Sequence, residues 1–298
     1  MIISFPFVTK ISFMPLKLLF VCLPLYLILI PLYGCRRSGA PLLTNNSSNN
    51  NPRNTDTLGP YQLVWSDEFN GSGLPDSTKW TYDVGGNGWG NRELEYYTYA
   101  RPENARIENG NLVIEARKES YSGSQYTSAR LLTKTKAQWT YGKFEIRAKL
   151  PRGIGTWPAI WLLSATQPLV WPDDGELDIM EEVGFNPNVI YGTAHNKMYN
   201  GAQGTQKGSS TLIPDAQDSF HVYSIEWTTN RVTWYVDSSA YFTYTDPGYG
   251  FNAWPYNKDF FIILNFAIGG NWGGQKGVDD SIFPQDLLVD YVRVYQRK

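Results

Sequence analysis

The stretch Gly142-Lys143-Phe144-Glu145-Ile146-Arg147-Ala148 alternates apolar and polar side chains with a period of two. Such alternation places successive side chains on opposite faces of a half-buried β-strand. Hardly any stretch of the chain shows a sustained helical period, although Asp215 to Ser219 could form one turn. The same alternation recurs in four other segments: Leu112 to Ala116, His221 to Trp227, Val232 to Val236 and Val289 to Tyr295. Many short strands, with 27 Gly and 18 Pro to supply turns, predict an all-β sandwich or barrel.

The chain divides into three regions by composition. Residues 59–298 read as one domain, because no internal repeat and no second domain is visible. Residues 36–58 are rich in Ser, Asn, Pro and Thr. A tract of this kind buries too little apolar surface to offset its ordering entropy, so it predicts a flexible tether.

The first 35 residues have the features of a targeting segment. Lys10 and Lys17 precede the apolar run 18–30, which has the length of a signal-peptide core. The following Leu32-Tyr33-Gly34-Cys35 resembles the lipobox of bacterial lipoproteins, in which the Cys becomes the lipidated N-terminal residue. We therefore expect a lipoprotein-type signal peptide over residues 1–35 and lipidation of Cys35. The protein would be exported and anchored to the cell envelope, at the outer membrane or cell surface. Plain secretion and a retained membrane anchor are the alternatives.

Charge and cysteine content exclude several function classes. The net charge is −2 with no basic stripe, so no nucleic acid is expected as a partner. The two cysteines, Cys22 and Cys35, lie in the targeting segment, which leaves the domain without a disulfide, a cysteine metal site or a thiol nucleophile. Aromatic residues make up 15% of the chain, which suits an aromatic core, a cleft that stacks sugar rings, or both.

Four carboxylates fall within seven positions of Gly175-Glu176-Leu177-Asp178-Ile179-Met180-Glu181-Glu182-Val183-Gly184. A solvent-facing strand could carry that many, but the interleaved Leu177, Ile179 and Val183 form an apolar face that should be buried. Glu176 and Asp178 then share the opposite face, where nothing structural would offset their repulsion.

The parity of Glu181 leaves two alternatives. In a regular strand Glu181 would point away from Asp178, and Glu182 would share the acidic face roughly 20 Å from Glu176, too far to cooperate. A β-bulge at Met180 would return Glu181 to that face. The acidic row is therefore either bulged and catalytic, or regular and of little chemical interest.

Retaining glycosidases use two carboxylates about 5–5.5 Å apart, one as nucleophile and one as acid/base. Glu176 and Glu181 would reach that separation by leaning towards each other past Asp178. The aspartate would then raise the pKa of a neighbouring glutamate by like-charge repulsion, or orient the nucleophile through a hydrogen bond.

The segment from Glu176 to Glu181 resembles the E-[IL]-D-x-x-E signature of glycoside hydrolase family 16, in the version with an extra Met that is typical of laminarinases. The resemblance extends over nearly all of residues 61–298. Further matching segments are Trp65 to Phe69, Gly88 to Asn91 with Glu93 and Tyr97, Gly155 to Trp161, Phe266 to Trp272 and Val289 to Tyr295.

This resemblance implies a β-jelly-roll sandwich of two antiparallel sheets with a concave substrate cleft. It also implies retaining hydrolysis with Glu176 as nucleophile, Asp178 as assisting carboxylate and Glu181 as acid/base, and no cofactor for catalysis. We expect a monomeric endo-β-1,3-glucanase that acts on laminarin-like β-glucan. The alternatives are a mixed-linkage β-1,3-1,4-glucanase, a galactan hydrolase of the same fold, and a non-catalytic β-glucan-binding protein. The last is disfavoured because both glutamates are present, and a purely structural lipoprotein would leave the acidic row unexplained.

Seven further residues are candidates for substrate binding. Trp157 and Trp161 share one strand face and would form cleft walls or core, while Trp89 and Trp272 lie in glycine-rich loops and favour sugar stacking. His195 is either structural or, as the resemblance implies, a cleft residue near the acid/base; His221 is read as structural. By family position, Asn91 and Arg130 would donate to sugar hydroxyls.

Some family members hold a structural Ca²⁺ on the convex face. The matching places in this chain are Glu68, the backbone carbonyl of Gly110, and Asp290. Oxygen ligands from separate segments suit Ca²⁺. The resemblance therefore implies a structural Ca²⁺ at these residues.

Overall fold

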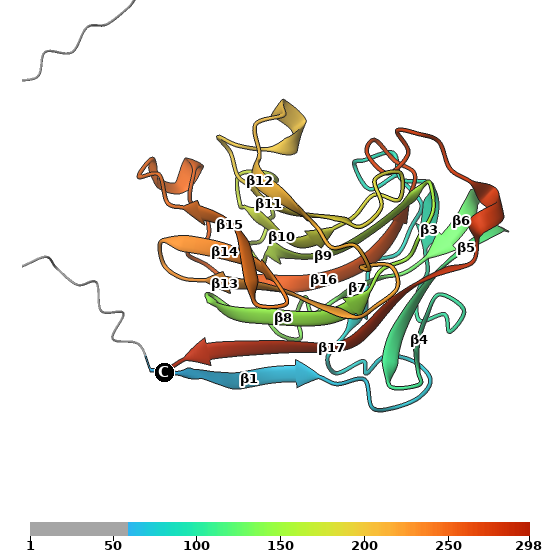
Figure 1. Ribbon diagram of the computed structural model, residues 1–298, viewed down its shortest axis with the longest axis horizontal. Helices are drawn as coiled ribbons and strands as arrows, with labels where there is room; N and C mark the ends of the chain where they lie inside the picture. Colours follow the sequence, from blue (N-terminus) through green and yellow to red (C-terminus); the bar gives the residue numbers. More distant parts are fainter. Residues whose placement is uncertain (1–58) are drawn as a thin grey trace, which may run out of the picture. The chain divides into compact units, whose positions relative to one another are not determined.

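Two stacked, curved β-sheets make up residues 59–298, the part of the chain that the structure, a computed structural model, describes (Figure 1). The predictions for residues 1–35, for Cys35 and for the tether over residues 36–58 lie outside the described residues. The predicted two-sheet, all-β architecture is confirmed.

The outer sheet has ten strands in the described chain, ordered β15-β14-β13-β8-β17-β5-β6-β3, with β1 beside β17 and β4 beside β5. All five segments predicted from alternation lie within its strands. One pair departs from the predicted antiparallel arrangement, because β3 runs parallel to β6. The strands are β1 (Tyr61–Asp67), β3 (Glu95–Tyr97), β4 (Ala105–Glu108), β5 (Asn111–Tyr121), β6 (Ser124–Ser128), β8 (Gly142–Lys149), β13 (His221–Trp227), β14 (Arg231–Val236), β15 (Ser239–Thr245) and β17 (Gln285–Arg297).

The inner sheet has seven strands within residues 59–298, in the order β12-β11-β10-β9-β16-β7-β2, and all its pairs are antiparallel. Its strands are β2 (Thr81–Tyr82), β7 (Arg130–Leu132), β9 (Thr156–Ser164), β10 (Glu176–Glu181), β11 (Val189–His195), β12 (Lys207–Leu212) and β16 (Phe260–Ile268).

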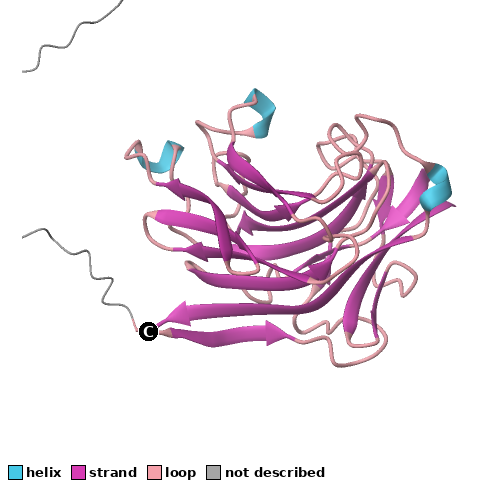
Figure 2. Cartoon of the chain, viewed as in Figure 1, coloured by secondary structure: helices cyan, strands magenta, loops and turns pink. Residues whose placement is uncertain are grey.

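Helical structure in the described chain is limited to three short 3₁₀ turns, which lie in loops outside the sheets (Figure 2). They are η1 (Gly201–Gln203), η2 (Gly250–Asn252) and η3 (Asp280–Ile282). The single turn expected near Asp215 forms, since the N–H of Ser219 donates to its carbonyl at 2.8 Å, but it does not extend into a helix. None of the helices within residues 59–298 is long and apolar enough to cross a membrane.

The core lies between the two sheets and is formed by one face of each. Along β8 the residues Phe144, Ile146 and Ala148 are buried, while the residues between them remain partly exposed. The largest buried side chains include Trp80, Trp227 and Trp234. Part of the high aromatic content is therefore explained by core packing.

The concave face of the inner sheet divides into a covered part and an open part. Phe261 and Ile263 of β16 form a small apolar cluster with Leu163, over which Leu169 packs. Farther along the same strand and the same face, Asn265 and Ala267 line an open cleft. All nine residues of β16 are buried, and the cleft extends from Asn265 and Ala267 to Leu163 and Leu169 of the apolar cluster.

Candidate active site

A cleft of about 1100 Å³ crosses the concave face of the inner sheet. All ten residues predicted for catalysis or substrate binding line it, although they come from four strands and two loops. They are Trp89, Asn91, Arg130, Trp157, Trp161, Glu176, Asp178, Glu181, His195 and Trp272. The fold thus brings segments more than 180 residues apart in the sequence to one surface.

The predicted bulge is present in β10. Asp178 pairs with Trp161 on β9, whereas Met180 pairs with the next residue, Ile160, so that Ile179 has no partner of its own. Ile179 and Met180 are both buried in the core, and Glu181 returns to the cleft. The extra residue in the register is Ile179 rather than Met180, which shifts the bulge by one position from the prediction.

Glu182, the fourth carboxylate of the segment, lies on the other side of the sheet. It is fully buried, and Oε1 accepts hydrogen bonds from the N–H of Asn188 at 2.6 Å and from Nε2 of Gln217 at 2.8 Å. Burial raises its pKa to about 7. Its contacts are with the loop after β10 and the turn before β13, so Glu182 has a structural place in the fold.

Burial and mutual repulsion govern the protonation of the two cleft glutamates. Desolvation, followed by the charge of Asp178, raises the pKa of Glu176 to about 8. The same two causes raise the pKa of Glu181 well above its ordinary value. Three acidic groups this close do not all ionise near neutral pH. The site therefore favours one protonated glutamate beside an ionised carboxylate, which is the state that acid/base chemistry needs.

Each of these glutamates accepts one hydrogen bond from an indole. Nε1 of Trp157 donates to Oε1 of Glu181 at 3.0 Å, and Nε1 of Trp171 donates to Oε2 of Glu176 at 3.0 Å. Because a donor to a carboxylate stabilises the charged form, both indoles oppose the rise in pKa that burial causes. Trp157 thus contacts an acidic residue of the cleft in addition to forming its wall.

His195 lies between the acidic row and the turn at η1. Its Nε2 is 3.1 Å from Oδ2 of Asp178, and its Nδ1 accepts the N–H of Gly201 at 3.0 Å. Burial lowers the pKa of His195, whereas the contact with Asp178 and the neighbouring glutamates raise it, with a net rise to about 9. The N–H of Gly201 opposes the binding of a second proton to the ring, because it already occupies the lone pair of Nδ1. In this arrangement the ring proton lies on Nε2, which faces Oδ2 of Asp178 at 3.1 Å.

Aromatic rings and one arginine form the rest of the cleft walls. The guanidinium of Arg130 lies 5.0 Å from the ring centroid of Trp89 and 4.8 Å from that of Trp161, and it forms an ion pair with Asp83 at 3.0 Å. Towards Glu181, the ring of Trp272 packs edge-on against Trp157. The cleft thus offers apolar ring faces with a cation held between two of them, which suits sugar rings and their hydroxyls.

A chain of hydrogen bonds that sequence reasoning missed connects the two walls. Nε1 of Trp161 donates to Asn265 at 2.7 Å, Asn265 donates to the Tyr97 hydroxyl at 3.1 Å, and that hydroxyl donates to Glu93 at 3.0 Å. Glu93 also accepts from the side chain of Asn91 at 3.0 Å. Asn265 could have been found, because it is the one polar residue in the apolar run of β16. Trp171 could not, because nothing in its local pattern indicates its contact with Glu176.

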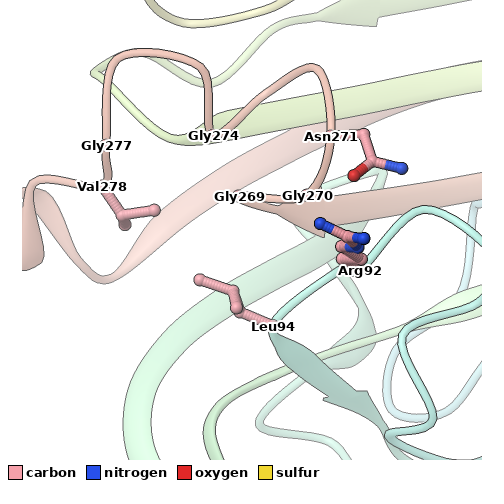
Figure 3. Close-up of a pocket in the computed structure, with 8 residues that line it drawn as sticks. All are labelled: Arg92, Leu94, Gly269, Gly270, Asn271, Gly274, Gly277 and Val278. Atoms are coloured by element: carbon pink, nitrogen blue, oxygen red, sulfur yellow. The ribbon is translucent and has the colours of Figure 1, made fainter.

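A second, smaller hollow of about 450 Å³ adjoins the cleft (Figure 3). The glycine-rich loop after β16 forms one side, and Arg92 and Leu94 form the other. Asn271 lines both the hollow and the cleft. The hollow and the cleft therefore share Asn271 in their walls.

The three residues predicted to hold Ca²⁺ lie on and near the outer sheet. Both oxygens of Glu68 accept hydrogen bonds from Arg293, at 2.9 and 2.7 Å, and Asp290 is 2.5 Å from Arg147. Gly110 occupies the turn between β4 and β5 with φ of 75°. Each carboxylate is thus neutralised by an arginine that a cation would have to displace. Calcium binding stays a prediction.

Comparison with known proteins agrees with the geometry of the cleft. Residues 93–292 match glycosyl hydrolases family 16. The chain belongs to this family. A beta-glucanase from Rhodothermus marinus is 58% identical over 244 residues, which are 79% of this chain and 85% of that protein. A glucan endo-1,3-beta-glucosidase from Cryptopygus antarcticus is 41% identical over 241 residues, 75% of this chain and 86% of that protein.

The fold of this family 16 member also matches that of solved relatives. The X-ray structure of the laminarinase from Rhodothermus marinus has a TM-score of 0.79 at 56% identity, covering 81% of this chain and 99% of that one. The jelly-roll arrangement of two sheets is therefore shared with a laminarinase.

Proposed function

We propose that this family 16 protein is a retaining endo-β-glucan hydrolase that cleaves β-1,3 linkages of laminarin-like glucans. The observation that carries the proposal is the acidic row of β10, in which a bulge turns Glu181 back to the face of Glu176 and Asp178. The similarity to a beta-glucanase and to an endo-1,3-beta-glucosidase supports the linkage.

The two glutamates divide the reaction between them. In the first step the ionised Glu176 attacks the anomeric carbon, the glycosidic C–O bond breaks, and the leaving oxygen takes the proton of Glu181. In the second step the ionised Glu181 takes a proton from water, whose oxygen attacks the same carbon and releases Glu176. The raised pKa of Glu181 keeps its proton available for the first step. Two inversions at one carbon retain its configuration.

Asp178 and His195 support this exchange of protons. The charge of Asp178 is a cause of the raised pKa of both glutamates, and Nε2 of His195 lies 3.1 Å from its Oδ2. We infer that Asp178 keeps the acid/base protonated until the glycosidic bond breaks. Sugar units would stack on Trp89, Trp161 and Trp272, with Arg130 and Asn91 donating to hydroxyls.

Release of reducing sugar from laminarin, lichenan, agarose and carrageenan tests this function, with Glu176→Ala as control. We expect the wild type to cut laminarin and the variant to lose at least about a thousandfold in rate. Cleavage of lichenan alone would favour the mixed-linkage alternative, and cleavage of agarose or carrageenan alone would favour a galactan hydrolase. A Glu176→Ala variant as active as the wild type would show that the site is wrong.

We further propose that the protein is exported and held at the cell envelope through a lipid on Cys35. The sequence of the leader and the lipobox-like residues before Cys35 support this. Metabolic labelling with an alkyne-tagged fatty acid, comparing the wild type with Cys35→Ala, tests it. Label on the wild type alone is expected; equal labelling of both proteins, or of neither, contradicts it.

A further inference from the structure

Trp171 contacts the proposed nucleophile from a loop outside the sheet. It lies five residues before Glu176, and 43% of its surface is exposed at the rim of the cleft. Its Nε1–H donates to Oε2 of Glu176 at 3.0 Å, and its ring centroid lies 6.0 Å from that of His195. The other oxygen of Glu176, Oε1, accepts no hydrogen bond from the described residues, and Nε2 of His195 lies 3.8 Å from it.

The loop that carries Trp171 is held in place from both ends. Asp174 accepts the N–H of Val170 at 2.7 Å and forms an ion pair with Lys258 at 2.5 Å. Gly175, which precedes β10, has a φ of 89°, and a Cβ there would lie 2.8 Å from Pro255. The backbone at Gly175 therefore packs closely against the loop that contains Pro255. The hydrogen bond within this turn and its ion pair to a neighbouring loop hold the indole of Trp171 in place.

The geometry points to Trp171 as a positioning residue that holds Oε2 of Glu176 and leaves Oε1 free to attack the anomeric carbon. A carboxylate that rotates freely presents its attacking lone pair for only part of the time. A single fixed N–H donor on one oxygen removes that freedom and orients the other oxygen. The proposal deepens the proposed function, because it depends on Glu176 being the nucleophile.

The same hydrogen bond has a consequence for pH dependence. The charged groups that face Glu176 are Asp178 and Glu181 on its own strand, His195 on β11 and Arg130 on β7. Against the burial and Asp178 that raise the pKa of Glu176, the Trp171 N–H lowers it. Glu176 attacks only when ionised. Loss of the N–H therefore raises its pKa and moves the acidic limb of the kcat/KM profile to higher pH.

The test is the kcat/KM profile of Trp171→Phe on a laminarin oligosaccharide of defined length. Phe keeps an aromatic ring and removes the N–H. We expect kcat/KM at neutral pH to fall by about tenfold to a hundredfold, the loss of one hydrogen bond to a charged group. The acidic limb should move to higher pH, while the basic limb, which reports Glu181 with its own indole donor, should move less. A wild-type profile for Trp171→Phe would overturn the proposal.

Two further variants separate positioning from a general loss of structure. Trp80→Phe removes a matched indole N–H, which donates to Asp67 at 2.8 Å in the core, and should leave both limbs unchanged. Asp174→Ala removes the hydrogen bond and the ion pair that hold the Trp171 loop. It should therefore shift the acidic limb in the wild-type background and not in a Trp171→Phe background. Additive shifts would show that Asp174 acts independently of Trp171, which would contradict the inference that Asp174 holds Trp171 in place. Should the wild type itself cut no glucan, the proposed function fails, which is a different result from an active enzyme that is indifferent to Trp171.

Discussion

Asp178 and Glu181 lie three residues apart on β10, yet both line the cleft, because two buried residues separate them on the core side. In a regular strand an odd separation would place them on opposite faces. The bulge therefore decides whether this strand has one acidic row or two unrelated carboxylates.

Deleting Met180 tests this relationship. The deletion leaves Glu181 two residues after Asp178, on the same face of a regular strand, so activity should persist at a reduced level. Loss of the buried Met180 side chain should lower the free energy of unfolding by about 2–5 kcal/mol. Deleting both Ile179 and Met180 places Glu181 next to Asp178, facing the core, and should abolish activity. Activity and thermal melting of the two variants check this; a folded single deletion as inactive as Glu181→Gln would contradict it.

The roles of the two glutamates are distinguished by the products formed with azide. In Glu181→Ala the glycosyl-enzyme still forms on an activated substrate, and azide attacks it to give a β-glycosyl azide. In Glu176→Ala azide takes the place of the nucleophile and gives the α-glycosyl azide. Proton NMR of the anomeric signal identifies each product. Exchange of the two outcomes would mean that the roles of Glu176 and Glu181 are reversed.

Asp178→Asn should move the kcat/KM profile to lower pH. The charge of Asp178 raises the pKa of both Glu176 and Glu181, so its removal lowers both. The basic limb moves to lower pH because Glu181 must be protonated, and the acidic limb moves to lower pH because Glu176 must be ionised. The profile is measured between about pH 4 and pH 10. A basic limb that stays at its wild-type position would show that Asp178 does not set the protonation of Glu181.

Arg130→Lys should weaken substrate binding more than chemistry. The planar guanidinium lies between the rings of Trp89 and Trp161, and a lysine keeps the charge without filling that space. We expect KM for laminarin oligosaccharides to rise about tenfold, with kcat changed by less than about threefold. Arg152→Lys, whose exposed ion pair with Asp218 lies outside the cleft, is the control. A loss confined to kcat would assign Arg130 to the reacting centre instead.

A stability measurement checks the aromatic core. Trp227 is almost fully buried, packs against Phe144 and Phe260, and donates from Nε1 to the carbonyl of Tyr256 at 3.0 Å. Trp227→Ala should lower the free energy of unfolding by about 3–5 kcal/mol. Tyr249→Ala, at an exposed position, should change it by less than about 0.5 kcal/mol. Equal effects in urea unfolding would mean that Trp227 is not a core residue.

Much of the fold followed from local pattern. Period-two alternation identified β5, β8, β13, β14 and β17, and it matches the burial most closely in β8, where buried and partly exposed residues alternate along the whole strand. It could not identify β16, which is buried on both faces and has no alternation to read. The parallel pairing of β3 with β6 was also missed, since a three-residue strand has too little pattern to indicate its partner.

The sequence by itself determined the acidic row. Its residue types, its spacing and its odd parity required a bulge if the row was to act chemically, and resemblance to a family supplied the roles. The tertiary structure alone decided which side chains reach that row. Trp171 contacts Glu176 from a loop that the ion pair of Asp174 with Lys258 ties to a neighbouring loop, and Asn265 on β16 joins Trp161 on β9 to Tyr97 on β3. Contacts of this kind depend on how distant segments pack, and no local pattern encodes them.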